Sequence, residues 1–137
     1  MITSKSWSDG YGLFLEGESD LVLSYTTSPA YHSLIEDSQK YKSLNFEEGH
    51  ASQIEVMGIL KNASNLDLAK SFLEFSLTNG FQQHIPQGNW MYPVLNLKET
   101  QKDFYDAAPL PVSLDQVFPS STEKDTWIAN WENSIID

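Results

Sequence analysis

The chain has no cysteine and no arginine among its 137 residues. Without cysteine there are no disulfides, no thiol catalysis and no zinc sites built from thiolates. Its 8 basic side chains, all lysines, face 19 carboxylates, and the net charge is -11. A nucleic-acid partner needs a basic stripe that displaces counterions from phosphates, so we expect no nucleic-acid partner.

Long apolar runs are also missing. Runs such as Leu21-Val22-Leu23 fall far short of the roughly 20 residues that span a bilayer. The N-terminal residues Met1 to Lys5 carry one charged side chain with no apolar stretch behind it, which is not the pattern of a secretory signal peptide. We therefore expect either a cytoplasmic protein or a chain that begins downstream of its own signal.

Apolar residues make up 40% of the chain, enough for a sizeable core, and their spacing predicts three helices. The first spans Ser6 to Glu16 and ends at Gly17. The second begins at an Asn65 N-cap and carries a leucine stripe. Ser120 and Glu123 predict a capping box before a final helix.

Two segments predict strands. Asp20 to Tyr25 contains a continuous apolar run, typical of a strand buried on both faces of a parallel sheet, and Gln53 to Leu60 alternates weakly. Ser28 and Pro29 are suited to the N-cap and first turn of a helix after the first strand. A helix followed by a buried strand indicates an α/β fold.

Signatures of catalysis are weak. The three histidines are scattered, without the spacing of a metal site, and neither a nucleophile elbow nor a phosphate or dinucleotide motif occurs. We expect no catalytic residue, no metal and no cofactor. A Ser/His/Asp hydrolase remains an unsupported alternative.

The segment that follows the first predicted strand is more informative. Hydroxyl groups and free helix N–H groups at the carboxyl end of a strand can hold a polar ligand, although a simple turn would contain the same residues. These residues are Tyr25, Thr26, Thr27 and Ser28.

Several aromatic residues could form a stacking box for a flat or cationic ligand. They are Trp7, Tyr25, Tyr31, Trp90 and Tyr92, and core packing is the alternative. Trp90 follows a stretch rich in helix breakers, residues 86–89, which predicts a loop and places this ring at a cleft. By contrast, Tyr11, Phe14, Phe72, Trp127 and Trp131 lie on helical stripes, which predicts packing.

Three runs carry a family resemblance: KSWSDGYGLF at 5–14, LVLSYTTSPAYH at 21–32 and GNWMYPV at 88–94. In this order they resemble the thiamine-binding periplasmic receptors of Gram-negative bacteria. The likeness covers nearly all of this chain but less than half of a family protein, its C-terminal portion. It implies part of a two-lobed type II solute-binding fold of α/β class. Residues 1–50 would belong to the second lobe and hinge, and residues 51–137 to the hinge return strand and C-terminal helices.

The resemblance also implies the ligand and its contacts. Thiamine, or one of its phosphate esters, would bind Trp7, the segment from Tyr25 to Ser28, Tyr31 and Trp90. A thiazolium cation beside a flat aminopyrimidine suits aromatic faces and hydroxyl groups. Ferric-binding relatives use adjacent tyrosines, and this sequence has no such pair.

The implied function is thiamine binding in the periplasm and delivery to the permease of an ABC importer, without a chemical step. A signal peptide and an N-terminal lobe would then belong to the full-length protein, and this portion alone could self-associate. A receptor for another organic cation, such as a polyamine, is the nearest alternative, followed by a fragment with only a structural role.

Overall fold

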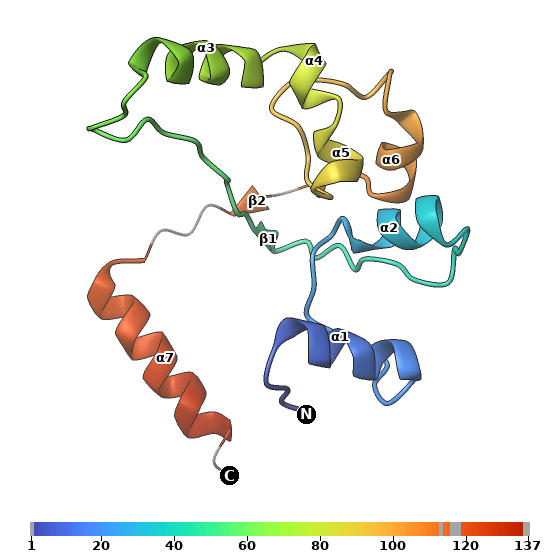
Figure 1. Ribbon diagram of the computed structural model, residues 1–137. Coiled ribbons are helices and arrows are strands. Elements are labelled where there is room, and N and C mark those ends of the chain that lie inside the picture. Colours follow the sequence, from blue (N-terminus) through green and yellow to red (C-terminus); the bar gives the residue numbers. More distant parts are fainter. Residues whose placement is uncertain (1, 113, 116–118, 136–137) are drawn as a thin grey trace. The chain divides into compact units, whose positions relative to one another are not determined.

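The computed structural model describes residues 2–112, 114–115 and 119–135. Most of its regular secondary structure is helical, and long loops join the helices (Figure 1). In chain order the elements are α1 (Trp7–Glu16), α2 (Ser28–Ile35), β1 (His50–Ala51), α3 (Leu66–Ser76), α4 (Asn79–Gln82), α5 (Ile85–Gly88), α6 (Lys102–Ala107), β2 (Leu114–Asp115) and α7 (Ser121–Ile135).

Contacts divide the chain into two units. The first contains Met1–Leu44 and Val56–Pro111, and the second contains Asn45–Glu55 and Val112–Asp137. All seven candidate ligand-binding residues lie in the first unit. The assignment of residues 1–50 and 51–137 to lobe and hinge stays a prediction.

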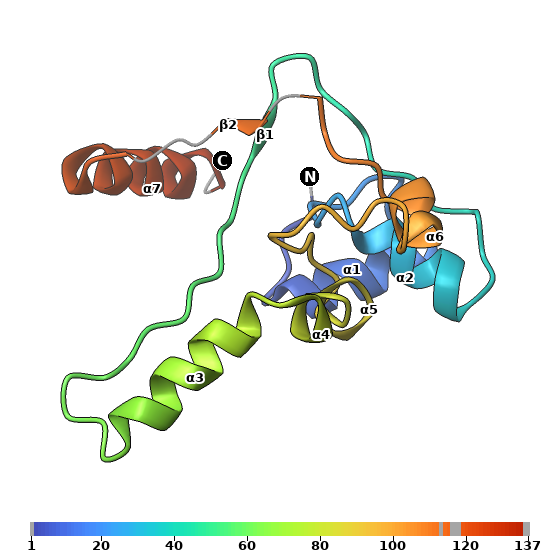
Figure 2. The same cartoon turned by 90° about the horizontal axis from the view of Figure 1, so that it is seen from above.

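The core of the first unit lies between α2 and α6, which are side by side in both views (Figures 1 and 2). Ala30 of α2 is fully buried against Phe104 of α6 and Ala108, which directly follows α6. The small alanine side chains leave room for the Phe104 ring, and Trp90 and Tyr92 pack around this cluster. The core thus connects α2, which begins in the hydroxyl segment (Tyr25 to Ser28), to the loop that carries Trp90.

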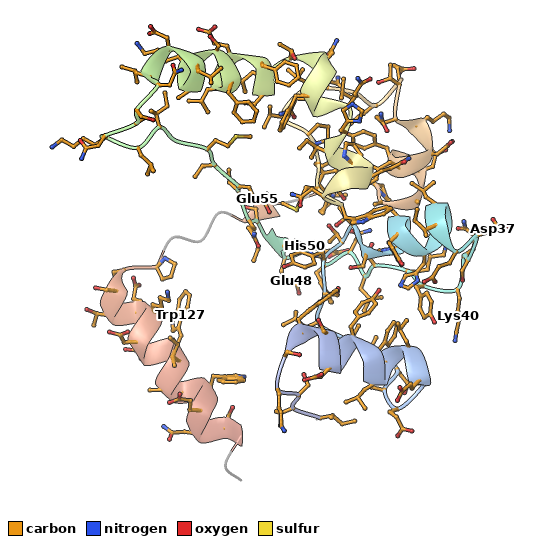
Figure 3. All side chains as sticks on the ribbon, in the orientation of Figure 1. Asp37, Lys40, Glu48, His50, Glu55 and Trp127 are labelled. Atoms are coloured by element: carbon orange, nitrogen blue, oxygen red, sulfur yellow. The ribbon has the colours of Figure 1, made fainter. Side chains whose placement is uncertain are left out.

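In the second unit, β1 and β2 form a parallel pair, with His50 opposite Leu114 and Ala51 opposite Asp115. The His50 Nε2 accepts a hydrogen bond from the Phe46 backbone N–H at 3.1 Å, which fixes the loop that leads into β1. Figure 3 shows His50 beside this short strand, between Glu48 and Glu55 in the chain.

Both predicted strands are wrong. Neither Asp20–Tyr25 nor Gln53–Leu60 pairs with another strand among the described residues. Leu23 is 93% exposed, so the first segment is not buried as predicted, and Val56 in the second segment is 87% exposed. An apolar run becomes a strand only when neighbours satisfy its backbone groups, and the described residues supply no neighbour for these two segments.

The predicted glycine stop of α1 and the predicted N-cap of α3 are confirmed, while Ser6, predicted as the first helical residue, is the N-cap of α1. The Ser6 hydroxyl accepts from the Asp9 backbone N–H at 3.1 Å, and Gly17 ends α1 with a φ of 86°, a left-handed conformation that glycine adopts without a steric penalty. The Asn65 side chain accepts from the Leu68 N–H at 3.0 Å. Each cap satisfies an N–H that has no partner within its helix.

Two predictions around proline need correction. The N-cap of α2 is Thr27, one residue before the predicted Ser28, and Ser28 is the first helical residue. Pro86 to Gly88, predicted as loop, belong to the short helix α5. In both helices the proline lies at the first or second position, where its missing N–H costs no hydrogen bond.

The capping box of α7 is confirmed, but the packing role of its tryptophans is wrong. The backbone N–H of Ser120 donates to Glu123 Oε2 at 2.9 Å, and the Ser120 hydroxyl accepts from the Glu123 N–H at 3.3 Å. Trp127, seen in Figure 3 projecting from α7, is 51% exposed, and Trp131 is 60% exposed. Apart from α7 itself, the described residues of the second unit form the strand pair and loops, and these rings remain uncovered.

The capping box predicts an acid-sensitive helix start. Hydrogen bonds from the Ser120 side chain and backbone hold the pKa of Glu123 below its ordinary value of 4.5. The contribution of Glu123 is therefore complete above pH 4.5 and is lost as the pH falls through the lower, folded-state pKa. Amide exchange in the first turn of α7 should accelerate in that acidic range. The Glu123→Gln variant keeps the capping geometry without a titrating group, so its exchange should lack this acid-dependent change.

Candidate functional site

Trp7 and Tyr25 form the first aromatic pair of the candidate site. Trp7 is the first residue of α1, and Tyr25 lies in the turn before α2, with the ring centroids 6.1 Å apart and the planes tilted by 56°. Trp7 is 51% exposed and Tyr25 is 53% exposed. Both rings therefore present open faces to which a flat cation could bind.

Tyr31 and Trp90 form a second pair. Their rings meet edge to face at 5.3 Å, one from α2 and the other from the loop after α5. The Trp90 backbone has a φ of 53°, a left-handed conformation that is unusual for a large side chain. Packing against the buried cluster of α2 and α6 holds the ring in place despite that strain.

The hydroxyl segment before and within α2 is divided between core and surface. The Thr26 side chain lies close to the Tyr92 phenol, which donates to the carbonyls of Ala108 and Pro109 at 3.2 Å. Thr27 is 4% exposed, so its hydroxyl is turned away from solvent. Of the three predicted hydroxyl contacts, Thr26 and Ser28 are the more accessible.

Ser24 also belongs to the site, although no pattern in the sequence points to it. Its hydroxyl accepts from the indole N–H of Trp7 at 3.2 Å and lies 2.8 Å from the Ser28 hydroxyl. The separation of 17 residues between Trp7 and Ser24 has no periodic signature. The structure thus brings Trp7 and Ser28 together through a residue that sequence reasoning missed.

His32 lies behind this surface and is 2% exposed. Its Nε2 lies 2.8 Å from the Tyr11 hydroxyl, and its Nδ1 lies 2.7 Å from Glu36 Oε2. In the sequence, His32 is one of three scattered histidines, and the spacing of Tyr11 predicts a packing residue. The spacing of four residues between His32 and Glu36, which places both side chains on one helix face, was the available signal.

The turn after α2 covers the other side of the His32 ring. Asp37, at a φ of 50°, reverses the chain, and Figure 3 shows Asp37 and Lys40 on this turn. Lys40 Nζ lies 5.2 Å from the centroid of the Tyr41 ring, which lies 4.3 Å from that of His32. His32 is therefore enclosed by aromatic rings as well as by its two hydrogen-bond partners.

Ring contacts connect the two aromatic pairs. Trp7 stacks on Tyr11 at 5.0 Å, Tyr11 on His32 at 5.9 Å, and His32 meets Tyr31 edge on at 5.5 Å. Tyr31 in turn meets Trp90. The expected binding residues on α1, α2 and the loop after α5 thus belong to one packed aromatic array.

This arrangement offers aromatic faces and hydroxyl groups for binding. Within residues 2–112, 114–115 and 119–135, no three histidine or carboxylate side chains gather as a metal site would require. None of the helices in that part of the chain is long and apolar enough to cross a membrane.

Comparison with known proteins gives consistent matches, while no family model matches the chain. It is 43% identical over 134 residues to the thiamine-binding periplasmic protein of Escherichia coli, 39% identical over 133 residues to that of Brucella suis, and 37% identical over 140 residues to that of Haemophilus influenzae. Each match covers 96% of this chain but 40% of the relative. The chain therefore spans about two fifths of the length of these relatives.

A solved structure agrees with these sequence matches. A periplasmic thiamin binding protein superposes with a TM-score of 0.79 at 44% identity, over 94% of this chain and 41% of that protein. This match confirms the predicted resemblance and the type II solute-binding fold, of which the chain spans a part.

The buried phenols predict a loss of stability at alkaline pH. Burial raises the pKa of Tyr11, Tyr92 and Tyr105 above the ordinary value of 10.0, although hydrogen bonds from Ser28 to Tyr11 and from Thr26 to Tyr92 partly offset the rise. The folded state holds these protons more tightly than the unfolded state. The stabilisation is therefore complete below pH 10.0 and is lost as the pH rises through the folded-state pKa values.

Tyrosinate absorbance and chemical unfolding, both followed against pH, check this expectation. The Tyr92→Phe variant should lose part of the alkaline dependence, since it has one buried phenol fewer. A variant whose stability falls as steeply with pH as that of the wild type would contradict the assignment of Tyr92.

Proposed function

We propose that this chain forms one wall of the thiamine site in a periplasmic substrate-binding protein of an ABC importer. The observation that supports it most directly is the open pair of Trp7 and Tyr25, joined through Ser24 to the Ser28 hydroxyl. The relatives named as thiamine-binding proteins match the chain over nearly its whole length.

The chemistry of thiamine suits this wall. The ring faces of Trp7, Tyr25 and Tyr31 can bind a thiazolium cation, at about 0.5 to 2 kcal/mol for each contact. The Ser28 hydroxyl and the first N–H groups of α2 suit the hydroxyl or phosphate end of the ligand. The net charge of -11 also attracts a cation at long range.

The opposite wall would come from residues beyond this chain, since the relatives are more than twice as long. Two lobes that close on thiamine would then present it to the permease in the membrane, and no bond would be made or broken. In this proposal the protein acts in the periplasm, as the relatives' names indicate for them.

A chimera tests the site assignment. The chain replaces the matching 134 residues of the Escherichia coli relative, and thiamine binding is measured by calorimetry. Trp7→Ala and Tyr25→Ala should each weaken binding by about tenfold or more, since each removes a contact worth about 1 to 2 kcal/mol.

Trp131→Ala is the matched control, because this indole lies on α7, in the other unit, and is 60% exposed. It should bind thiamine as the parent chimera does. Unchanged affinity in both site variants, with folding intact, would contradict the assignment, and preference for a polyamine over thiamine would favour the other organic-cation receptor.

The isolated chain should bind thiamine poorly and self-associate. Pockets that enclose a small ligand bury about 70 to 90% of its surface, which one wall cannot do. Losing three opposing contacts at about 1.4 kcal/mol each would weaken binding roughly a thousandfold. Leu23, Val56 and Leu60 are at least 82% exposed, and such uncovered apolar surface favours association.

Tryptophan fluorescence during a thiamine titration, with light scattering on the same sample, measures both properties. Submicromolar affinity in a monomeric chain would show that the opposite wall is dispensable.

A further inference from the structure

Two sets of hydrogen bonds lie between the surface of the candidate site and its interior. The first begins at the Trp7 indole N–H and passes through Ser24 to Ser28. The second joins the Tyr11 phenol to His32 Nε2 and His32 Nδ1 to the Glu36 carboxylate. The two sets meet where the Trp7 ring stacks on the Tyr11 ring, with the ring centroids 5.0 Å apart.

The end groups fix the direction of their own bonds. An indole N–H only donates, so the Ser24 oxygen accepts from Trp7. An ionised carboxylate only accepts, so His32 Nδ1 carries a proton and donates to Glu36. A ring whose only proton is on Nδ1 accepts from Tyr11 through Nε2.

We propose that His32 and Glu36 are positioning residues for the ligand site: through Tyr11, which stacks on Trp7, they hold the Trp7 ring beside Tyr25. This inference rests on the proposed function, because Trp7 is expected to contact the ligand. Neither positioning residue lies on the open faces of the aromatic pair. His32 is buried, and Glu36 lies at the far end of α2 from Ser28.

Glu36→Gln tests the direction of the bonds, because the amide keeps the shape of the side chain but can both donate and accept. The matched control is Glu74→Gln, the same change at an exposed position on α3. Both changes are made in the chimera with the Escherichia coli relative. Nitrogen chemical shifts of His32 report which ring nitrogen is protonated, and the indole N–H signal, assigned with Trp7→Phe, reports the other end.

In the parent chimera we expect the His32 proton on Nδ1. Glu36→Gln should raise the share of the Nε2-protonated ring, move the Trp7 indole signal and weaken thiamine binding about two- to tenfold, the effect of one or two hydrogen bonds. Glu74→Gln should change none of these. If Glu36→Gln fails to fold, Tyr11→Phe, which keeps the ring and removes one hydroxyl, should shift the same indole signal and weaken binding.

The readouts separate this inference from the proposed function. A chimera that does not bind thiamine at all would contradict the proposed function, and with it the positioning role. Normal thiamine binding together with an Nε2-protonated or doubly protonated His32 would overturn only the hydrogen-bond directions assigned to His32. Unchanged affinity and an unmoved Trp7 signal in folded Glu36→Gln and Tyr11→Phe variants would overturn the positioning role while leaving the thiamine site intact.

Discussion

The buried imidazole of His32 bonds one partner through each ring nitrogen, Tyr11 on α1 and Glu36 at the end of α2. A buried polar ring without such partners would destabilise the fold by a few kcal/mol, so the three side chains constrain one another. Tyr11 lies one helical turn from Trp7, and the two rings stack. The contact between α1 and α2 therefore determines where the exposed Trp7 ring lies.

The second constraint is the core between α2 and α6. Ala30 and Ala108 bring backbone close to the Phe104 ring, and the same cluster supports Trp90 in its strained conformation. Tyr31 projects from α2 toward Trp90 and contacts it edge on. Helix α2 thus carries one ring of the second pair and, through His32, supports the first. A binding surface that stacks a flat cation needs this kind of fixed ring geometry, because freely rotating rings would lose entropy on binding.

The helices were predictable where local chemistry decides them. Side-chain caps at Asn65 and Ser120 and the glycine stop at Gly17 act within a few residues, so their patterns can be read directly. The cap of α2 was predicted one residue late, because Ser28 and Thr27 are both plausible caps and the choice depends on how the preceding turn enters the helix. The strands failed for a different reason: strand pairing requires distant partners, and apolar composition alone does not supply them.

Sequence alone determined which residue types are available for binding, namely tryptophan and tyrosine rings near a run of hydroxyl groups, and the three matching runs determined the resemblance. It could not show that Trp7 donates to Ser24, that Thr27 is buried, or that His32 lies between Tyr11 and Glu36. The Trp7–Ser24 and Tyr11–His32 contacts join residues 17 and 21 positions apart, with no periodic spacing to reveal them. Only the packing of α1 on α2 brings them within hydrogen-bond distance, and that packing arises from burial and hydrogen bonding across the whole unit.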